Sequence, residues 1–282
     1  MIATAERKTK PKPPDVAGIS AELQRLQRRR TWFLKTRNMI ANRLQATVAG
    51  TLGYHSGMKE ADRTKVFGEA GKLIKAIVAG EVESDIAGLV VPTAAAIEGF
   101  NSNKTALEKE MTRQAKQLPA AAWVERPEQR GFGILFLAIV IGETGDLHNY
   151  ANPAKVWRRL GCAPHTFDGK TLMGATWKSG KSGKLPAAEW EAFGYSPRRR
   201  SIAFLIGEGI VKQNFPKGGN GADEAGVETE RGYAGPYRQR YDETKALCHE
   251  KHPDYSDLRC HRHGMLLATK RLLLNLWVEW NN

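Results

Sequence analysis

Hydrophobic residues recur every three or four positions from residue 19 onward, which is the period of an amphipathic helix. Two interleaved series with steps of seven define one seam: Ile19, Leu26, Phe33, Ile40 and Thr47, and Leu23, Arg30, Arg37, Leu44 and Thr51. The pattern predicts either a coiled coil or an amphipathic helix packed within its own domain. Arg30 and Arg37 interrupt the seam, which costs stability and either fixes the register or faces a phosphate.

A break at residues 50–57 ends this first helix. Residues 61–78 and 93–118 predict two further helices, with a turn at residues 88–92 between them. Their inward positions are Val66, Leu73, Ile74 and Ile77, and then Ile97, Leu107 and Met111. We therefore expect a coiled-coil or helical hairpin domain over residues 18–118. A disordered basic tail over residues 1–17 precedes it, and a mostly helical domain over residues 119–282 follows.

The most apolar run of the chain, residues 134–141, directly follows Gly131 and Gly133. Two glycines before a helix allow a tight turn and leave the first amides free, and the helix dipole adds positive charge there. A glycine-rich turn and Asn152-Pro153 then start a second helix, which carries Arg158 and Arg159. This helix-hairpin-helix-like pattern suits a phosphate. The alternative is a buried apolar helix beside an amphipathic neighbour.

The rest of this domain combines short turns, cationic loops and closing helices. Asp168-Gly169 predicts the turn of a short β-hairpin that includes Lys170. Residues 178–184 form a cationic loop with Lys178, Lys181 and Lys184, whose Gly-Lys-Ser lacks the glycine spacing and preceding strand of a P-loop. The next helix begins with three arginines, Arg198, Arg199 and Arg200. They form either a solvated face or a phosphate clamp, and we favour the clamp. Residues 237–249 and 265–280 predict closing helices, so the fold class is mainly α.

Charge and cysteine content narrow the class of protein. The chain has 282 residues, with 43 Lys and Arg against 30 Asp and Glu, a formal net charge of +13. That excess favours a polyanionic partner, nucleic acid before membrane. No stretch approaches the roughly 18 apolar residues that a membrane span requires, and we expect no signal peptide. Three cysteines make no disulfide framework, so we expect a reducing cytoplasm.

Two sets of residues are candidates for chemistry. The first has Cys2His2 composition and would hold zinc, although its central spacing of seven is short for a zinc finger; it comprises Cys248, His252, Cys260 and His263. Its alternative is a His-rich turn with incidental cysteines. The second set comprises serines among Lys and Arg, which would attack a phosphodiester with cationic assistance: Ser179, Ser182, Ser196 and Ser201. Their alternative is a role as helix caps or solvated loop residues.

Three short motifs of this domain follow one another in the same order as the motifs of a known protein family. They are Gly131-Phe132-Gly133-Ile134, Ile141-Gly142-Glu143-Thr144-Gly145-Asp146 and Gly161-Cys162-Ala163-Pro164. They resemble the C-terminal domain of insertion-sequence transposases related to the pilin-gene-inverting recombinase, the bridge-RNA-guided recombinases. Residues 194–200 are similar in place to that family's Ser-Lys-Arg-Gly stretch. Residues 265–280 resemble its closing helix, and residues 19–51 its coiled coil, so the resemblance covers most of residues 18–282.

The resemblance implies DNA binding in transposition or recombination, a guide RNA, homo-oligomers paired through the coiled coil and a serine nucleophile. This sequence departs from the family twice. It offers no four-carboxylate nuclease domain, so we expect no cofactor in this chain and assign Mg²⁺ to a separate nuclease subunit. Asp168 stands where the family has its serine, and Ser179 and Ser182 lie further on. The second hypothesis is a non-catalytic architectural protein that binds nucleic acid; the third is a zinc-stabilised interaction module.

Overall fold

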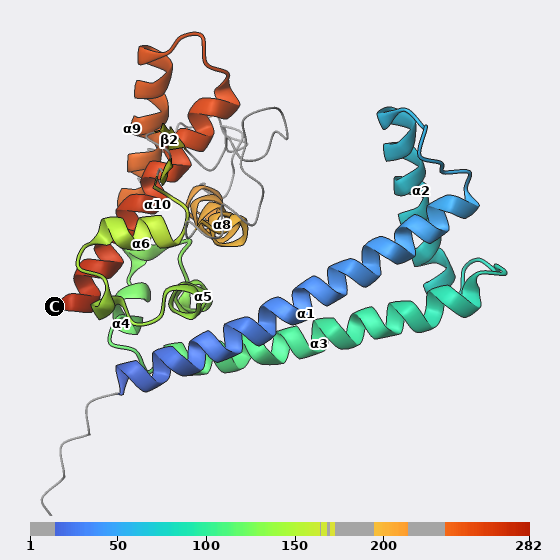
Figure 1. Cartoon of the computed structure of the whole chain (residues 1–282), viewed down its shortest axis with the longest axis horizontal. Coiled ribbons are helices and arrows are strands. Elements are labelled where there is room, and N and C mark those ends of the chain that lie inside the picture. Colours follow the sequence, from blue (N-terminus) through green and yellow to red (C-terminus); the bar gives the residue numbers. More distant parts are fainter. Residues whose placement is uncertain (1–14, 164, 168–169, 173–194, 214–234) are drawn as a thin grey trace, which may run out of the picture. The chain divides into compact units, whose positions relative to one another are not determined.

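The structure is a computed structural model that describes residues 15–163, 165–167, 170–172, 195–213 and 235–282. Its fold is mainly α, as the sequence predicts (Figure 1). The helices are α1 Val16–Thr51, α2 Glu60–Ala79, α3 Ala87–Ala115, α4 Ala121–Val124, α5 Ile134–Thr144, α6 Pro153–Arg159, α8 Pro197–Gln213, α9 Pro236–Lys251 and α10 Asp257–Asn281. Two 3-10 turns, η1 Pro127–Gln129 and η2 Leu147–Asn149, lie between them.

Two three-residue strands, β1 His165–Phe167 and β2 Lys170–Leu172, pair antiparallel. The register sets Phe167 opposite Lys170, on either side of the Asp168-Gly169 pair at which the sequence predicts a turn. Those two residues lie outside the described residues.

The chain divides into two compact units, which we describe separately. Arg25–Met111 forms one, here called the three-helix unit, and the residues before Arg25 join Thr112–Asn282 in the other, here called the C-terminal unit. Both boundaries fall within long helices, α1 and α3. The three-helix unit is therefore shorter at each end than the domain that the sequence predicts over residues 18–118.

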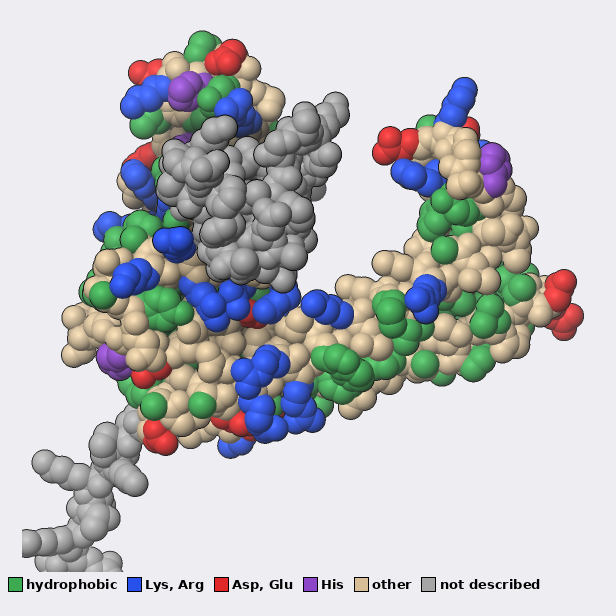
Figure 2. Space-filling view, in the orientation of Figure 1, with side chains coloured by type: hydrophobic (Ala, Val, Ile, Leu, Met, Phe, Trp, Pro, Cys, Tyr) green, Lys and Arg blue, Asp and Glu red, His purple; other side chains and the backbone are tan. Residues whose placement is uncertain are grey.

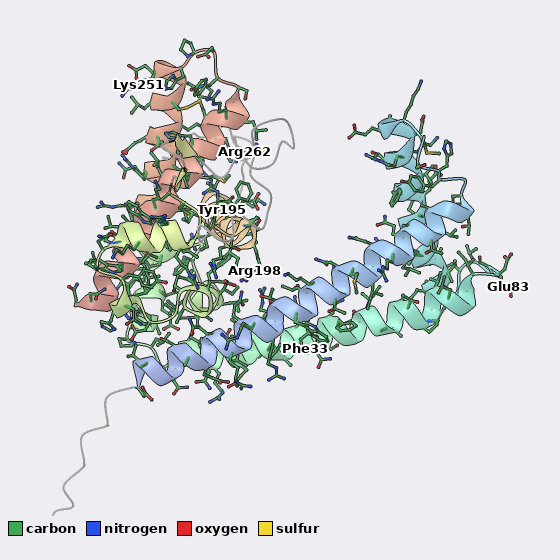
Figure 3. All side chains as sticks on the ribbon, viewed as in Figure 1. Phe33, Glu83, Tyr195, Arg198, Lys251 and Arg262 are labelled. Carbon is green, nitrogen blue, oxygen red and sulfur yellow. A yellow bond between two sulfur atoms is a disulfide. The ribbon has the colours of Figure 1, made fainter. Side chains whose placement is uncertain are left out.

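In the three-helix unit, α1 and α3 lie side by side and run antiparallel (Figure 1). Phe33 of α1, labelled in Figure 3, packs its ring 5.9 Å from that of Phe100 in α3. Arg30, one of the two polar interruptions of the predicted seam, donates from Nε to Glu108 Oε1 at 2.8 Å. The pair is largely shielded from water, with side chains 16% and 17% exposed. The seam of α1 therefore faces a helix of the same chain.

A small hydrophobic core closes the other end of this unit. It consists of Leu44, Val48, Ala49, Ala70, Ile77 and Val90. Tyr54 packs edge-on against Phe67 with ring centres 5.0 Å apart, and the Gln45 amide donates to the Phe67 carbonyl oxygen at 2.9 Å. These contacts attach α2 to the end of α1.

The predicted turn at residues 88–92 is wrong, because α3 already begins at Ala87 and contains Pro92. Proline disfavours a helix by removing one amide donor, here the partner of the Gly88 carbonyl. Gly88 is exposed, so water can hydrogen-bond that carbonyl. The cost of Pro92 is therefore low this near the start of the helix.

In the C-terminal unit, α6, α8, α9 and η2 all pack on α10. The buried face of α10 includes Met265, Leu272, Leu273 and Leu276. Two indole groups tie the helices together across this core: Trp157 of α6 donates to the Lys270 carbonyl oxygen at 3.0 Å, and Trp277 of α10 donates to that of Tyr150 at 2.9 Å. Such bonds allow large apolar rings to be buried without an unsatisfied N–H.

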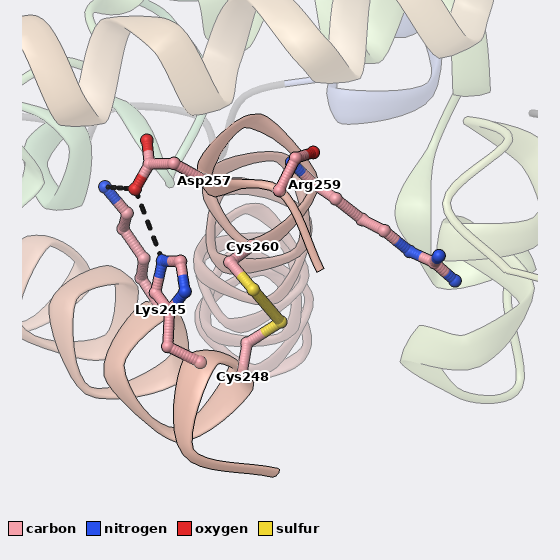
Figure 4. The surroundings of a disulfide bond; sticks show 7 residues. Lys245, Cys248, Asp257, Arg259 and Cys260 are labelled. Carbon is pink, nitrogen blue, oxygen red and sulfur yellow. Dashed lines mark hydrogen bonds and ion pairs between the residues drawn. A yellow bond between two sulfur atoms is a disulfide. The ribbon is translucent and has the colours of Figure 1, made fainter. Parts of the chain in front are cut away.

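A disulfide joins Cys248 near the end of α9 to Cys260 at the start of α10 (Figure 4). Beside it, Asp257 accepts from Lys245 at 2.8 Å and from His249 at 3.2 Å. The three cysteines predict no disulfide framework, and this bond is not anticipated from the sequence. The spacing of twelve residues did not reveal that the chain reverses between the two cysteines, which brings their Cα atoms to 5.5 Å.

The segment before α5 touches α8 backbone to backbone. Gly131 has a positive φ of 94°, and a Cβ atom there would lie 2.6 Å from the Gly209 carbonyl oxygen. A Cβ atom on Gly209 would likewise lie 2.6 Å from the Gly131 carbonyl oxygen. Both positions therefore require glycine.

We expect Gly209→Ala to lower the free energy of unfolding of the C-terminal unit by about 1–3 kcal/mol, because the clash is with backbone. Gly133→Ala is the matched control, since nothing lies within 4 Å of a Cβ atom there. It should cost no more than about 1 kcal/mol as a changed helix cap. Urea unfolding followed by tryptophan fluorescence measures both, and equal losses would contradict the close approach.

Candidate nucleic-acid interface

Glu143 ends the most apolar helix of the chain and is itself buried. It lies in the last turn of α5, next to the buried run that includes Val140 and Ile141, and is 4% exposed. A buried carboxylate is costly unless it is paired and hydrogen-bonded. The surroundings of Glu143 therefore decide how the helices near it are arranged.

Two arginines from the start of α8 bind the Glu143 carboxylate. Arg198, labelled in Figure 3, contacts both oxygens: Nη1 binds Oε1, and Nη2 donates to Oε2 at 2.7 Å. This two-point geometry matches a guanidinium to a carboxylate. Arg199 adds a bond from Nε to Oε2 at 3.3 Å. One carboxylate thus fixes the first turn of α8.

A third arginine reaches the same residue from α6. Arg159 Nε donates to the Glu143 backbone carbonyl oxygen at 3.2 Å. We call Glu143, Arg159, Arg198 and Arg199 the Glu143 cluster. Two of its guanidinium groups bind the carboxylate and the third binds the backbone carbonyl of the same residue, so three positive charges gather around Glu143.

The groups of the Glu143 cluster lie close enough to shift one another's pKa. Burial lowers the pKa of Arg199, the positive charge of Arg159 lowers it further, and Glu143 opposes both. Burial raises the pKa of the Tyr150 hydroxyl, against the influence of Arg159 and Arg199. An additional anion would relieve the mutual repulsion of these arginines. Arg198 is the more accessible of the α8 pair, at 37% side-chain exposure against 19% for Arg199.

The connection from α5 to α6 holds the cluster in place. Gly145 has a φ of 79°, which favours glycine, and Asp146 accepts from the His148 amide at 3.0 Å and from the Trp280 indole at 2.9 Å. Burial alone would raise the pKa of Asp146, but these hydrogen bonds lower it overall. Asn152 caps α6 by accepting from the Lys155 amide at 3.2 Å. The start of α6 at Asn152-Pro153 is as the sequence predicts.

Gly131 and Gly133 lie at the other end of α5. Gly133 is the exposed N-cap residue of α5 and no side chain caps the helix, whereas Gly131 makes the close approach to α8. Residues 124–133 and Gly235 line a cavity of about 670 Å³ here. The eleven residues of α5 span roughly 16 Å. The two glycines and the Glu143 cluster therefore do not form one phosphate site.

The predicted clamp of three consecutive arginines is divided in the structure. Arg198 and Arg199 turn to Glu143, while Arg200 lies beside Cys162 and Lys270. Burial raises the pKa of the Cys162 thiol, and Arg200 opposes that effect through its charge and a hydrogen bond. The three arginines therefore do not all bind one group, since Arg200 points away from the carboxylate that Arg198 and Arg199 share.

Other predicted binding residues have separate positions or lie outside the described residues. Arg158 is exposed on α6. The backbone of Lys170 belongs to β2. The remaining candidates fall outside the described residues: Lys178, Lys181, Lys184, Ser179 and Ser182.

The four zinc candidates do not come together as a site. Cys248 and Cys260 are bonded to each other, and His252 stacks on Tyr255 with ring centres 4.4 Å apart. Burial lowers the pKa of His263. Within the described residues, no three His, Cys, Asp or Glu side chains are grouped so as to hold a metal ion.

Sequence reasoning missed Glu143 as an organising residue and treated it as part of a turn. One signal was present, since Glu143 is an acid at the end of an otherwise apolar helix. Its partners on α8 lie 55 and 56 positions away, which no local pattern reveals.

No protein-family model, curated protein or solved structure matches the chain. No helix in the described part of the chain is long and apolar enough to cross a membrane.

We expect Glu143→Gln to destabilise the C-terminal unit by about 3 kcal/mol, because it leaves partly buried guanidinium groups without their counter-charge. The matched control is Glu208→Gln on α8, whose ion pair with Lys212 is largely exposed and contributes only about 0.5 kcal/mol. Tryptophan fluorescence during urea unfolding measures both. Equally small losses would show that the cluster does not depend on the Glu143 charge.

Proposed function

We propose that the chain is the DNA-binding C-terminal half of a transposase or site-specific recombinase, acting in DNA transposition or recombination. The observation that carries the proposal is the Glu143 cluster, in which three arginines from two helices meet around one glutamate. A DNA phosphate is the anion that this arrangement suits, because guanidinium groups bind phosphate oxygens with directed hydrogen bonds. The charge of +13 supports a polyanionic partner.

The resemblance to the bridge-RNA-guided recombinases supports the more specific part of the proposal. Glu143, Gly145 and Asp146 are the residues of the motif Glu-x-Gly-Asp. In this chain they respectively gather the arginines, adopt a positive φ and bind the indole of Trp280. In this proposal α5 and α6 act as a helix-hairpin-helix-like element. The proposed partners are a guide RNA, a second copy of the chain in a homo-oligomer, and a separate nuclease subunit that holds Mg²⁺.

Catalysis by this chain would take the form of serine attack on DNA. The hydroxyl oxygen of Ser179 or Ser182 would bond to phosphorus, a sugar oxygen would leave, and the serine proton would pass to that leaving group or to solvent. Nearby lysines or arginines would stabilise the charge on the phosphoryl oxygens. The alternative is a non-catalytic architectural protein that binds nucleic acid without cleaving it.

DNA binding is tested by fluorescence anisotropy with a labelled duplex at several salt concentrations. We expect Arg199→Gln to weaken binding several-fold and to reduce the slope of log K against log salt by about 0.9, the loss of one phosphate contact. This variant keeps the two-point bond between Arg198 and Glu143.

Lys212→Gln is the matched control, since it removes the same charge from α8 at an exposed position with only a surface ion pair. It should change neither the affinity nor the slope. A response to salt that is flat for the unmodified chain would refute the proposed binding altogether.

Covalent chemistry is tested by incubating the chain with end-labelled DNA and then adding SDS. A transposase with a serine nucleophile should yield an SDS-resistant protein–DNA adduct. The adduct should disappear in Ser179→Ala or Ser182→Ala. It should persist in Ser201→Ala, which serves as the control because the Ser201 hydroxyl donates to the Pro197 carbonyl oxygen at 3.0 Å within α8. Absence of an adduct with duplex DNA, single-stranded DNA and added RNA would favour the architectural alternative.

A further inference from the structure

The part of α1 in the three-helix unit carries an unusual charge pattern. Residues 25–51 contain six arginines and one lysine and no acidic residue. The Glu108 side chain of α3 pairs with one of them, Arg30. Arg28, Arg29, Lys35 and Arg43 are exposed, and none of these four forms an ion pair with a described residue.

These exposed cations share one face of α1 with two large hydrophobic side chains. Trp32 and Met39 lie on the same face at helical spacing and are 57% and 48% exposed. We call this surface the Trp32 face, defined by Arg28, Arg29, Trp32, Lys35, Met39 and Arg43. On the face that Figure 2 presents, basic and hydrophobic side chains lie close together over the α1–α3 pair. The seam that faces α3 lies elsewhere on α1 and includes Arg30 and Phe33.

Trp32 is held in place although it is exposed. Its ring packs edge-on against Phe33 at 5.0 Å between centres and tilts against Phe100 of α3 at 6.0 Å. These contacts restrict the indole while more than half of the side chain stays open to solvent. An exposed ring that is already ordered loses little entropy when a ligand stacks on it.

We propose that the Trp32 face binds single-stranded nucleic acid. An unpaired base would stack on Trp32, and phosphates on either side would lie against Arg28 or Arg29 and against Lys35 or Arg43. Aromatic rings between cations are the usual means of binding single strands without sequence preference. A duplex fits less well, because its bases are already stacked on one another and unavailable to the indole.

The charge of this face also excludes other occupants. A second copy of the chain packed through this same face would bring the same cations against one another, which is unfavourable. A membrane-surface helix requires a continuous apolar face, whereas here Trp32 and Met39 are interspersed with cations. The inference does not rest on the Glu143 cluster, which belongs to the C-terminal unit.

The test uses the full chain and two fluorescein-labelled probes that differ only in the sugar, a 20-nucleotide oligo-dU and a 20-nucleotide oligo-U, with a 20-base-pair duplex for comparison. Trp32→Ala should weaken binding of at least one single strand by about tenfold, the effect of losing one stacked base, and should leave duplex binding unchanged. Trp32→Phe should retain most of the affinity. Whichever probe responds identifies the sugar that the face accepts.

Leu89→Ala on α3 is the matched control, since it removes an exposed hydrophobic side chain of the same unit that lies outside the Trp32 face. It should bind both single strands as the unmodified chain does. Circular dichroism checks that each variant retains its helices, which is expected because Trp32 is largely exposed.

Three outcomes would overturn the inference. The first is unchanged single-strand affinity in Trp32→Ala. The second is an equal loss for the duplex, which would indicate a general effect. The third is a change in Trp32→Ala confined to the oligomeric state in sedimentation or to binding of phosphatidylserine vesicles, which would assign the face to a second copy or to a membrane.

Discussion

The C-terminal unit depends on the cost of burying one carboxylate. Glu143 lies at the end of a helix whose apolar sequence requires burial, and its charge cannot remain there unpaired. The end of α6 and the start of α8 supply the compensating groups through Arg159, Arg198 and Arg199. The same bonds that satisfy Glu143 also concentrate positive charge. A requirement of folding and the proposed binding of a phosphate therefore involve the same atoms.

The two units present positive charge in different chemical forms. In the C-terminal unit the arginines are partly buried, oriented by hydrogen bonds and accompanied by a tyrosine. In the three-helix unit the cations are exposed along a helix and accompanied by a tryptophan. The first form suits a phosphate held in a defined geometry, and the second suits a flexible strand whose bases are accessible.

Local patterns in the sequence predicted local structure well. The helical class, the start of α6 at Asn152-Pro153 and the basic character of α1 all follow from spacing and composition. The features that the sequence did not reveal depend on how segments pack in three dimensions. Pro92 predicted a turn, yet it lies inside α3. Nothing in the sequence around Cys248 and Cys260 shows that the chain reverses between them and brings them together. The role of Glu143 was likewise hidden, because its arginines lie on another helix.

The order in which the helices are synthesised has a consequence for folding. The three-helix unit is complete once residue 111 has emerged from the ribosome, and it can pack while synthesis continues. The C-terminal unit cannot, because α6, α8 and α9 all pack on α10, which is translated after them. Until then the faces of α6, α8 and α9 that pack on α10 stay exposed and prone to aggregation, so this half of the nascent chain is the one expected to need a chaperone.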